Sequence, residues 1–313
     1  YEHFSAFGES VDGKLSSRFE FTPDLAVRGS VSTGFRAPTV GQANVRNVRT
    51  AIFEGELQDV ALLPPTHPVS LLKGGKELTP EESRSYALGL VYSGSGFFFT
   101  ADFFRIEVDD RISQSTEFDV TQTDRDVLRA AGVRGVESLS KVTFLTNDFD
   151  TVTTGLDLVA NYSTSLLDGR STFSLAYNWT DTEVKRFTAV TGDFKVSRLE
   201  KDLPDHRATL TWNQQWQDID MFIRGNYYGS FQGVHADDPG LTGEGSAKVT
   251  FDVEVAYHWN DNFSVAIGAQ NVFDTEPERL PAEFSSILGA KYFETSPMGI
   301  NGGYYYLKGI YRF

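Results

Sequence analysis

The sequence predicts an all-β protein whose strands form a transmembrane antiparallel β-barrel. Apolar and polar residues alternate along segments of about ten residues, the pattern of strands with two unlike faces. Tight polar turns close these segments at one end, and long loops connect them at the other. The 313 residues include 28 Gly, 13 Tyr and 25 Phe but only 2 Met, and this composition favours strands over helices.

Charge and cysteine content exclude several classes of protein. The chain carries 28 Lys and Arg against 43 Asp and Glu, a net charge of −15. A nucleic-acid partner is not expected, because it would require a basic face. The absence of Cys excludes disulfides, thiolate metal sites and a Cys nucleophile. No run of about 18 apolar residues occurs, so no transmembrane helix is expected.

Five hairpins follow one another along the chain, each with apolar residues at alternate positions on both sides of a turn. Their strands lie within 15–31, 86–103, 156–179, 210–227 and 249–269, with turns at 22–24, 93–96, 167–170, 213–215 and 260–262. A last strand covers 305–313. The prediction is therefore about eleven strands.

The alternation is clearest before the last turn. Its apolar face carries Val249, Phe251, Val253, Val255, Tyr257 and Trp259, and its other face Thr250, Asp252, Glu254, Ala256 and His258. The alternation breaks at Phe104-Arg105, which we interpret as a β-bulge.

Long polar loops are expected near 37–80, 113–152, 183–206, 230–246 and 274–301. Short turns on one side and long loops on the other are typical of outer-membrane barrels, with their periplasmic turns and extracellular loops. Within one loop, residues 124–131 begin with an Asp, contain an apolar repeat and precede Gly132. This pattern predicts a short helix.

A soluble β-sandwich would show the same alternation, because one face of each sheet is buried. Two features favour the barrel. The apolar faces end in aromatic residues, as an interfacial girdle would: Tyr92, Tyr162, Trp179, Trp212, Trp259 and Phe313. The opposite faces carry charges that suit a polar lumen: Arg224, Asp157, Asp252, Glu254 and Lys308. The sandwich remains an alternative, as does a small enzymatic barrel.

Five short segments occur in an order that is itself informative. They are Ser32-Thr33-Gly34-Phe35-Arg36-Ala37-Pro38, Leu78-Thr79-Pro80-Glu81-Glu82-Ser83, Asn147 with Thr154-Gly155-Leu156-Asp157, Asn271-Val272-Phe273-Asp274 and Tyr311-Arg312-Phe313. Together they resemble segments of the TonB-dependent outer-membrane receptors. The resemblance implies that residues 1–313 are the C-terminal half of a 22-stranded barrel, without the plug domain and the first barrel half.

The resemblance also implies a function. It is active transport of a scarce nutrient, first of all a ferric siderophore, across the bacterial outer membrane. Uptake of oligosaccharide, haem or cobalamin, or a passive porin, are the alternatives. The implied partners are TonB with its inner-membrane energising complex, reached through the N-terminal part, outer-membrane lipid and lipopolysaccharide, and a small-molecule substrate. No enzyme activity and no cofactor are implied.

No catalytic or metal-binding motif is present, since the five His are scattered and no nucleophile elbow or phosphate-binding loop occurs. The candidate ligand contacts are Arg36, Arg46, Arg49 and Phe53 near the first loop, and Phe222, Arg224, Tyr228 and Tyr306 on the expected lumen face. Arginines there could pair with the anionic groups of a chelate. Arg36 has a structural alternative, in which it satisfies lumen carboxylates.

Two further predictions concern the chain end and the loops. Tyr311 and Phe313 are expected to act as a membrane-assembly signal. Asp148, Asp150, Asp237 and Asp238 could hold Ca²⁺, although exposed acidic turns are the favoured interpretation because no calcium loop surrounds them.

Overall fold

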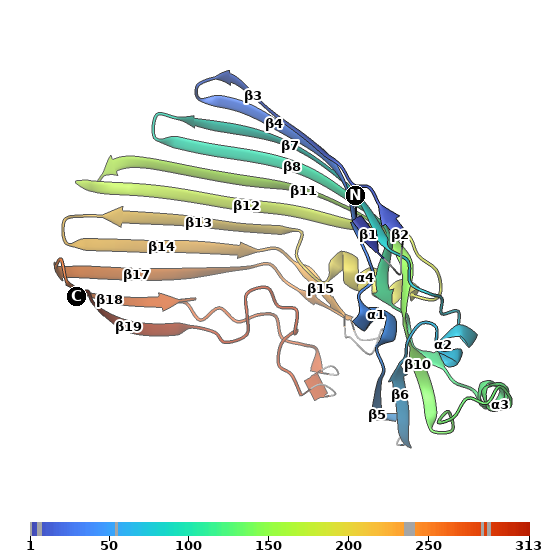
Figure 1. The fold of residues 1–313 in the computed structure, drawn as a ribbon. Helices are drawn as coiled ribbons and strands as arrows, with labels where there is room; N and C mark the ends of the chain where they lie inside the picture. The colour runs from blue at the N-terminus through green and yellow to red at the C-terminus, as the bar shows by residue number, and fades with distance from the viewer. Residues whose placement is uncertain (1, 5–7, 54–55, 235–241, 283–284, 287–288) are drawn as a thin grey trace.

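The computed structural model describes every residue except 1, 5–7, 54–55, 235–241, 283–284 and 287–288. Its main body is an eleven-stranded antiparallel sheet in the order β19-β18-β17-β14-β13-β12-β11-β8-β7-β4-β3. Figure 1 shows these strands side by side, with their short turns at one end and their long connections at the other. The all-β prediction and the strand count are confirmed. Because β3 and β19 are the two edges, the sheet is not closed within the described residues.

The strands of the sheet differ greatly in length. They are β3 (Lys14–Thr22), β4 (Leu25–Arg36), β7 (Glu81–Gly94), β8 (Phe97–Gln114), β11 (Leu145–Leu166), β12 (Gly169–Arg186), β13 (His206–Gln215), β14 (Ile219–Tyr228), β17 (Lys248–Asn260), β18 (Phe263–Gln270) and β19 (Tyr304–Tyr311). At the usual rise per residue, β11 spans roughly 70 Å and β13 roughly 33 Å. The sheet is therefore tall in its middle and low on the side of β13 to β19.

The two faces of the sheet differ as the alternation predicts. One face, here called the apolar face, exposes large hydrophobic side chains such as Leu88 and Leu307, which are 60% and 75% accessible. On the strands of the sheet, the buried apolar side chains among the described residues are Ala26, Phe149, Ala266 and Ala269. The sheet thus has almost no core of its own. None of the described helices is long and apolar enough to cross a membrane.

The predicted bulge at Phe104-Arg105 is wrong. Phe104 pairs regularly with Ala87 and Gly155, and the register shifts farther along, beside Asp110, whose φ is +53°. What changes at this point is the apolar face of β8, which runs Phe97, Phe99, Ala101, Phe103 and then Arg105, Glu107, Asp109. The break in alternation marks the upper end of the apolar band.

One predicted turn is also displaced. Gln214 and Gln215 belong to the ladder and pair with Met221 and Asp220, so the turn lies at 216–218 and not at 213–215. The reason is that the amide of Gln214 is buried: it donates to the carbonyl oxygen of Leu166 at 3.0 Å and accepts from the Ser171 hydroxyl. Gln214 therefore does not form a turn of its own. Its side chain hydrogen-bonds to residues on both sides of the turn between β11 and β12.

The connections 37–80 and 115–144 fold together into a second body, here called the tip (Figure 1). It contains β5 (Asn47–Phe53), β6 (Glu56–Leu62), β9 (Phe118–Asp119) and β10 (Leu139–Thr143), in the order β5-β6-β10-β9, together with α1 (Val40–Asn44), α2 (Pro68–Leu72) and α3 (Gln122–Ala130). β6 and β10 pair in parallel and so join the two connections. A compact core fills the tip: Ala61, Leu63, Val69, Val120, Leu128, Val136, Leu139 and Val142.

The helix expected at 124–131 is α3, and its beginning was predicted three residues late. Thr121 is the N-cap, because its hydroxyl accepts from the Asp124 amide at 3.2 Å. Asp124 is the third helical residue and accepts in return from the Thr121 amide at 2.7 Å. This reciprocal capping box satisfies two of the amides that the first turn leaves unpaired.

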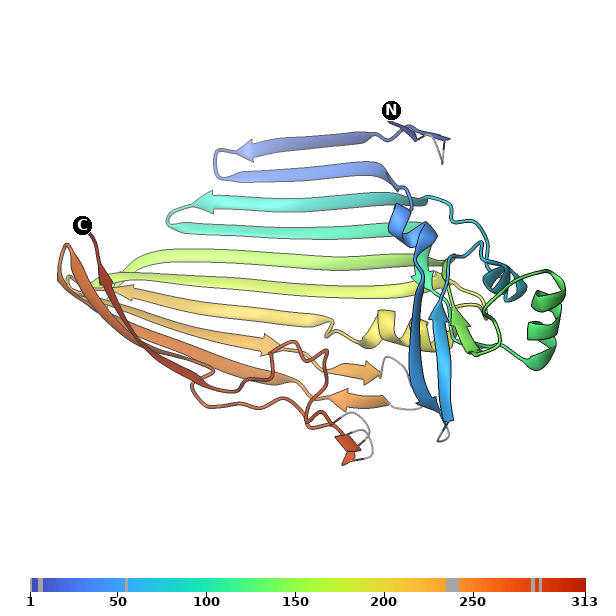
Figure 2. The same ribbon diagram turned by 60° about the horizontal axis from the view of Figure 1, so that its bottom comes forward.

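The remaining elements are β1 (Glu2–Phe4), β2 (Gly8–Ser10), α4 (Gly192–Lys201), β15 (Phe231–Val234) and β16 (Thr242–Gly245). Connections 229–247 and 271–303 share a small apolar cluster of Leu280 and Phe293 with Phe231. The Phe293 ring lies on Gly233 and Gly243, where an added Cβ would overlap the ring. Figure 2 shows these loops beside the low strands, on the same end of the sheet as the tip.

Candidate functional site

The second face of the sheet, here called the polar face, is organised in rows that cross the strands. One row holds directly opposed residues on nine neighbouring strands: Arg18, Arg28, Gly89, Asp102, Asp157, Asn178, Arg207, Tyr228 and Lys248. We call this row the girdle. The row forms because the register of each pair of neighbouring strands places these residues directly opposite one another.

Three charged members of the girdle, Arg28, Asp102 and Asp157, have hydrogen-bond partners within it. Arg28 donates to both carboxylate oxygens of Asp102, at 2.8 and 2.6 Å, across the intervening Gly89. A Cβ at Gly89 would overlap the Asp102 carboxylate, so this bidentate pair requires glycine there. Asn178 donates to Asp157 at 2.7 Å. The girdle side chains on β4, β8, β11 and β12 are therefore held in place by hydrogen bonds to one another.

A pocket of about 360 Å³ lies on the polar face, at the turn end of β13 and β14. Its polar lining is formed by Asn213, Gln214, Gln215, Asp220, Glu254 and Tyr306, together with Phe222 and Met221. The Tyr306 ring crosses Gly268 and its hydroxyl donates to Glu254 at 2.6 Å. Lys308 donates to the same carboxylate at 2.9 Å, so the charge of Glu254 is compensated.

Three cations on this half of the polar face lie over aromatic rings. Arg207 lies 5.5 Å from the ring centroid of Tyr228, Arg224 lies 4.7 Å from that of Phe222, and Lys308 lies 5.9 Å from that of Tyr306. We call these three pairs the cation–aromatic ladder. It brings together four of the residues singled out in the sequence, Phe222, Arg224, Tyr228 and Tyr306, on the face that carries Asp252 and Glu254.

The other predicted contacts lie elsewhere. Arg36 ends β4 and donates to both oxygens of the buried Glu81, at 2.5 and 2.6 Å, which matches its structural alternative. Arg46 is exposed after α1, and Arg49 lies on β5, 3.5 Å from Glu117. Phe53 ends β5, but its side chain is outside the described residues. The structure does not bring the three arginines together with the ladder.

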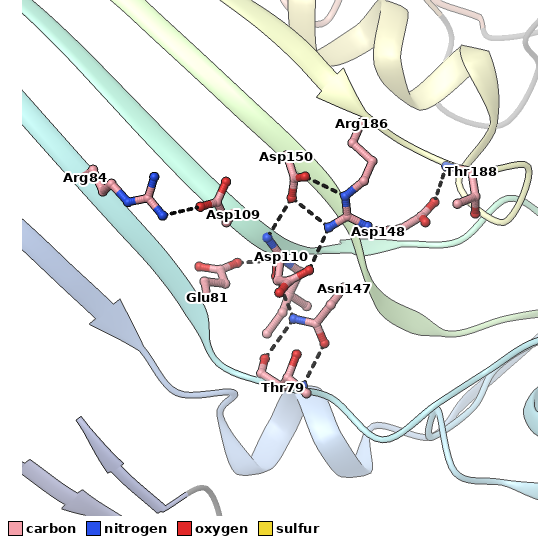
Figure 3. A network of polar contacts seen from close by, with 11 residues as sticks. Thr79, Glu81, Arg84, Asp109, Asp110, Asn147, Asp148, Asp150, Arg186 and Thr188 are labelled. Carbon is pink, nitrogen blue, oxygen red and sulfur yellow. Dashed lines mark hydrogen bonds and ion pairs between the residues drawn. The ribbon is translucent and has the colours of Figure 1, made fainter. Parts of the chain in front are cut away.

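Two of the short sequence motifs meet at the base of the long connections. The side chain of Asn147 donates to the carbonyl oxygens of Thr79 and Asp110, at 2.8 and 2.6 Å, and accepts from the Thr79 amide at 2.8 Å. Glu81, held by Arg36, also accepts from the Ile112 amide at 2.7 Å. Figure 3 shows these contacts joining β7, β8 and β11. We call this cluster the rim network.

Arg186 extends the rim network to β12. It donates to Asp150 at 2.5 Å and to Asp110 at 2.7 Å, and Asp150 also accepts from the Asp110 amide at 2.9 Å (Figure 3). The hydrogen bond from Arg186 is the main reason that the pKa of Asp150 lies below its ordinary value. Neither Asp110 nor Arg186 was singled out from the sequence, because 76 residues separate them and no linear motif joins them.

Two of the four carboxylates considered for Ca²⁺, Asp148 and Asp150, are engaged by other groups of the protein. Asp148 is buried and accepts from the Thr188 amide and from the Thr191 hydroxyl at 2.6 Å, so it is not an exposed acidic turn. Across the residues that the structure describes, no group of His, Asp and Glu side chains is arranged to hold a metal ion. Asp237 and Asp238 lie outside those residues.

The end of the chain lies on the edge strand β19. Tyr311 ends β19 opposite Phe263, and Phe313 follows two residues later; both side chains are exposed and their rings meet edge to face at 5.1 Å. Their role as an assembly signal stays a prediction.

Comparisons with known proteins agree with this architecture. The family model described as TonB dependent receptor-like, beta-barrel matches residues 1–272. The vitamin B12 transporter BtuB of Photobacterium profundum is 23% identical over 279 residues, which are 87% of this chain and 35% of that protein. The chain thus spans about a third of the length of this curated relative.

Solved structures resemble the fold at low identity. The ferric enterobactin receptor PfeA of Pseudomonas aeruginosa, in complex with BCV-L6, aligns with a TM-score of 0.65 at 15% identity, over 98% of this chain and 41% of that one. The siderophore receptor PirA of Acinetobacter baumannii gives 0.62 at 14% identity, over 99% and 42%. The copper transporter OprC gives 0.57 at 15% identity, over 96% and 39%.

Proposed function

The chain belongs to the TonB-dependent receptor β-barrel family, and we propose that it forms part of the wall of an importer in the bacterial outer membrane. The importer takes up a scarce nutrient, first of all a ferric siderophore, and draws its energy from TonB. The observation that carries this proposal is the cation–aromatic ladder on a polar face that backs onto an exposed apolar band.

The apolar face supports the membrane location. Its hydrophobic side chains are exposed on strand after strand, and the band ends in charged residues such as Arg105 and Glu107. Such a surface is stable only against an apolar phase, which lipid supplies. The charged residues above the band then lie at the level of lipid and lipopolysaccharide headgroups.

The polar face supports a transport path. In this proposal Phe222, Arg224, Tyr228 and Tyr306 line the lumen, where water and the passing solute contact them. Asp102, Asp157 and Glu254 are held by protein donors and keep the wall rigid. Arg36 belongs to this structural set, since Glu81 engages it.

The tip supports capture of the solute. It is a folded body on the loop end of the sheet, and Arg46, Arg49 and Phe53 belong to it or to its border. Arginines in such a position suit the carboxylates or catecholates of a chelate. TonB and its inner-membrane complex act through segments outside residues 1–313, and the family relatives are transporters and receptors, so no catalysis is proposed.

Cobalamin is the second candidate substrate, because a relative that is 23% identical to this chain is named a vitamin B12 transporter. The siderophore is placed first because the structures named as receptors for siderophores align over 98% or more of the chain.

The test is uptake by the full-length protein in a strain that lacks its own receptors. Radioactive iron is offered as ferric enterobactin, ferric citrate and a ferric hydroxamate, and radioactive cobalt as cyanocobalamin. We expect uptake of a ferric siderophore that disappears when TonB is deleted. Cobalamin uptake alone would replace the first candidate by the second, and uptake that does not need TonB would refute the mechanism.

A further inference from the structure

The ladder contains two cations that the wall does not neutralise. Among the described residues, no ion pair joins Arg207 or Arg224 to a carboxylate, and the buried Nε of Arg224 has no hydrogen-bond partner. Within the described part of the chain, the hydrogen bond that Arg207 donates goes to the carbonyl oxygen of Pro297, at 3.3 Å. A buried donor without a partner is rare in folded proteins and calls for an explanation.

The carboxylate directly opposite Arg224 does not supply a partner. Asp252 lies directly opposite Arg224 where β14 pairs with β17. Both of its oxygens are nevertheless engaged, one by the Asn271 amide at 2.9 Å and the other by the side chain of Asn226 at 3.0 Å. The wall thus satisfies Asp252 with neutral donors and leaves the guanidinium beside it uncompensated.

The other carboxylates on this half of the polar face are engaged as well. Glu254 is shared by Tyr306 and Lys308, and Asp220 lies 2.8 Å from His258. The charge of Arg224 therefore points to a partner that the described residues do not contain. Since a guanidinium presents a planar fork of donors, the matching partner is an oxygen anion such as a carboxylate or a phosphate.

The aromatic ring under Arg224 makes this a prepared site. Phe222 lies two residues before it on the same face of β14, and the guanidinium carbon is 4.7 Å from the ring centroid. The ring attracts the cation without using any of its hydrogen-bond donors. The side chain is thereby held with its donors available, which lowers the entropy lost when an anion binds.

Arg207 repeats the arrangement nearer the loops. Its guanidinium lies over Tyr228, which is four residues beyond Arg224 on the same face of β14. At the usual strand rise the two levels are roughly 13 Å apart. An anion that leaves Arg207 therefore meets a second, similar guanidinium on its way toward the turn end of the sheet.

We propose that Arg224, supported by Phe222, binds an anionic oxygen group of the transported solute, and that Arg207 on Tyr228 is the preceding step of the same path. This inference rests on the proposed transport function and assigns its substrate to the class of carboxylate- or phosphate-bearing solutes. The alternative source of the same chemistry is a carboxylate of another segment of the polypeptide.

The first test measures Arg224 directly in the purified full-length receptor. Phenylglyoxal modifies accessible arginines, and peptide mass spectrometry reports each site, with citrate as the anion probe. We expect Arg224 to react without citrate and to be protected by it. Arg28, engaged by both oxygens of Asp102, should react least, and Arg134, which is exposed after α3, should react throughout. An Arg224 that is unreactive without citrate has a polypeptide partner, and one that citrate does not protect binds no anion. Either result overturns the inference.

The second test measures transport of the solute found in the uptake experiment. Arg224→Gln should slow uptake by roughly tenfold, the loss of about one charge-assisted hydrogen bond, while Arg224→Lys keeps part of the rate. Arg170→Gln, at the turn between β11 and β12, is the control and should import normally. Equal import by Arg224→Gln and the wild type refutes the inference alone. If the wild type imports nothing, the proposed function fails, and citrate protection of Arg224 can still be measured.

Discussion

In the sheet, Leu88 and Leu307 expose most of their side chains on one face, whereas Ala61, Val69 and Val142 in the tip expose none. Hydrophobic side chains therefore lie on the outer surface of one region of the chain and in the interior of the other. The sheet gathers its apolar side chains on an outer surface that lipid must cover, and the tip covers its own. The difference predicts that the two regions respond to different mutations and different surroundings.

The largest effect is expected from a charge in the core of the tip. Val142→Asp places a carboxylate among Ala61, Val69 and Leu139 without a partner, and should destabilise the tip by about 4 kcal/mol. Hydrogen exchange should rise across 56–72 and 118–143 while exchange in the sheet stays unchanged. Val48→Asp is the control, since Val48 is half exposed on β5. Equal exchange in both variants would mean that the tip has no cooperative core.

A charge on the apolar face should cost somewhat less, and only in a membrane. Leu88→Arg should destabilise the full-length protein by about 2–4 kcal/mol in lipid vesicles, because the arginine would face hydrocarbon. Ala87→Arg, one residue away on the polar face, should be tolerated. Urea unfolding in vesicles measures both. If the two variants unfold alike, the assignment of the faces is wrong.

Loss of a helix cap in the tip should have a moderate effect. Thr121→Ala removes the hydroxyl that accepts from the Asp124 amide, and should cost about 1 kcal/mol. Local exchange in α3 is the measurement, and Thr121→Ser should restore protection because it keeps the hydroxyl. An unchanged α3 in the alanine variant would contradict the cap.

The smallest effect is expected where the two regions join. Arg186→Gln removes the ion pairs with Asp150 and Asp110, and should cost at most about 1 kcal/mol because all three side chains are partly exposed. The pKa of Asp150 is lowered by Arg186, so the pair stabilises the fold above the ordinary carboxyl pKa and loses this effect as the pH falls through the lowered one.

Exchange at the rim, measured against pH, checks this sign. The difference between Arg186→Gln and the wild type should be present near neutral pH and should shrink in acid. Arg84→Gln is the control, because Arg84 forms a looser ion pair with Asp109, at 3.5 Å. A difference that grows in acid would show that another group is responsible.

The comparison also explains what sequence reasoning could reach. The strands of the sheet were predictable because an alternation of two is a local signal, and so the polar face of Phe222, Arg224 and Tyr306 followed from parity alone. The tip was not predictable, because its core depends on parallel pairing of β6 with β10, in which Leu139 lies opposite Asp59. No short-range sequence pattern predicts a pairing between residues as far apart in the chain as Asp59 and Leu139.

The same limit applied to the candidate site. The sequence could place single members of the girdle on one face of the sheet. Predicting the row would have required the register of all nine strands. The uncompensated charge of Arg224 needed still more, because it depends on which donors Asp252 accepts from. Sequence parity gives the face of a residue, and only the structure gives its partners.

The parallel pairing inside the tip has a consequence for how such proteins diversify. Surface loops are usually treated as independent segments that recombination can exchange one at a time. Here a graft of 37–80 alone would leave Leu139 and Val142 of the resident loop without Ala61, Leu63 and Val69 against which they pack. The two loops form one heritable unit, so new specificities at this end should arise from paired exchanges and from point changes on the outside of the tip.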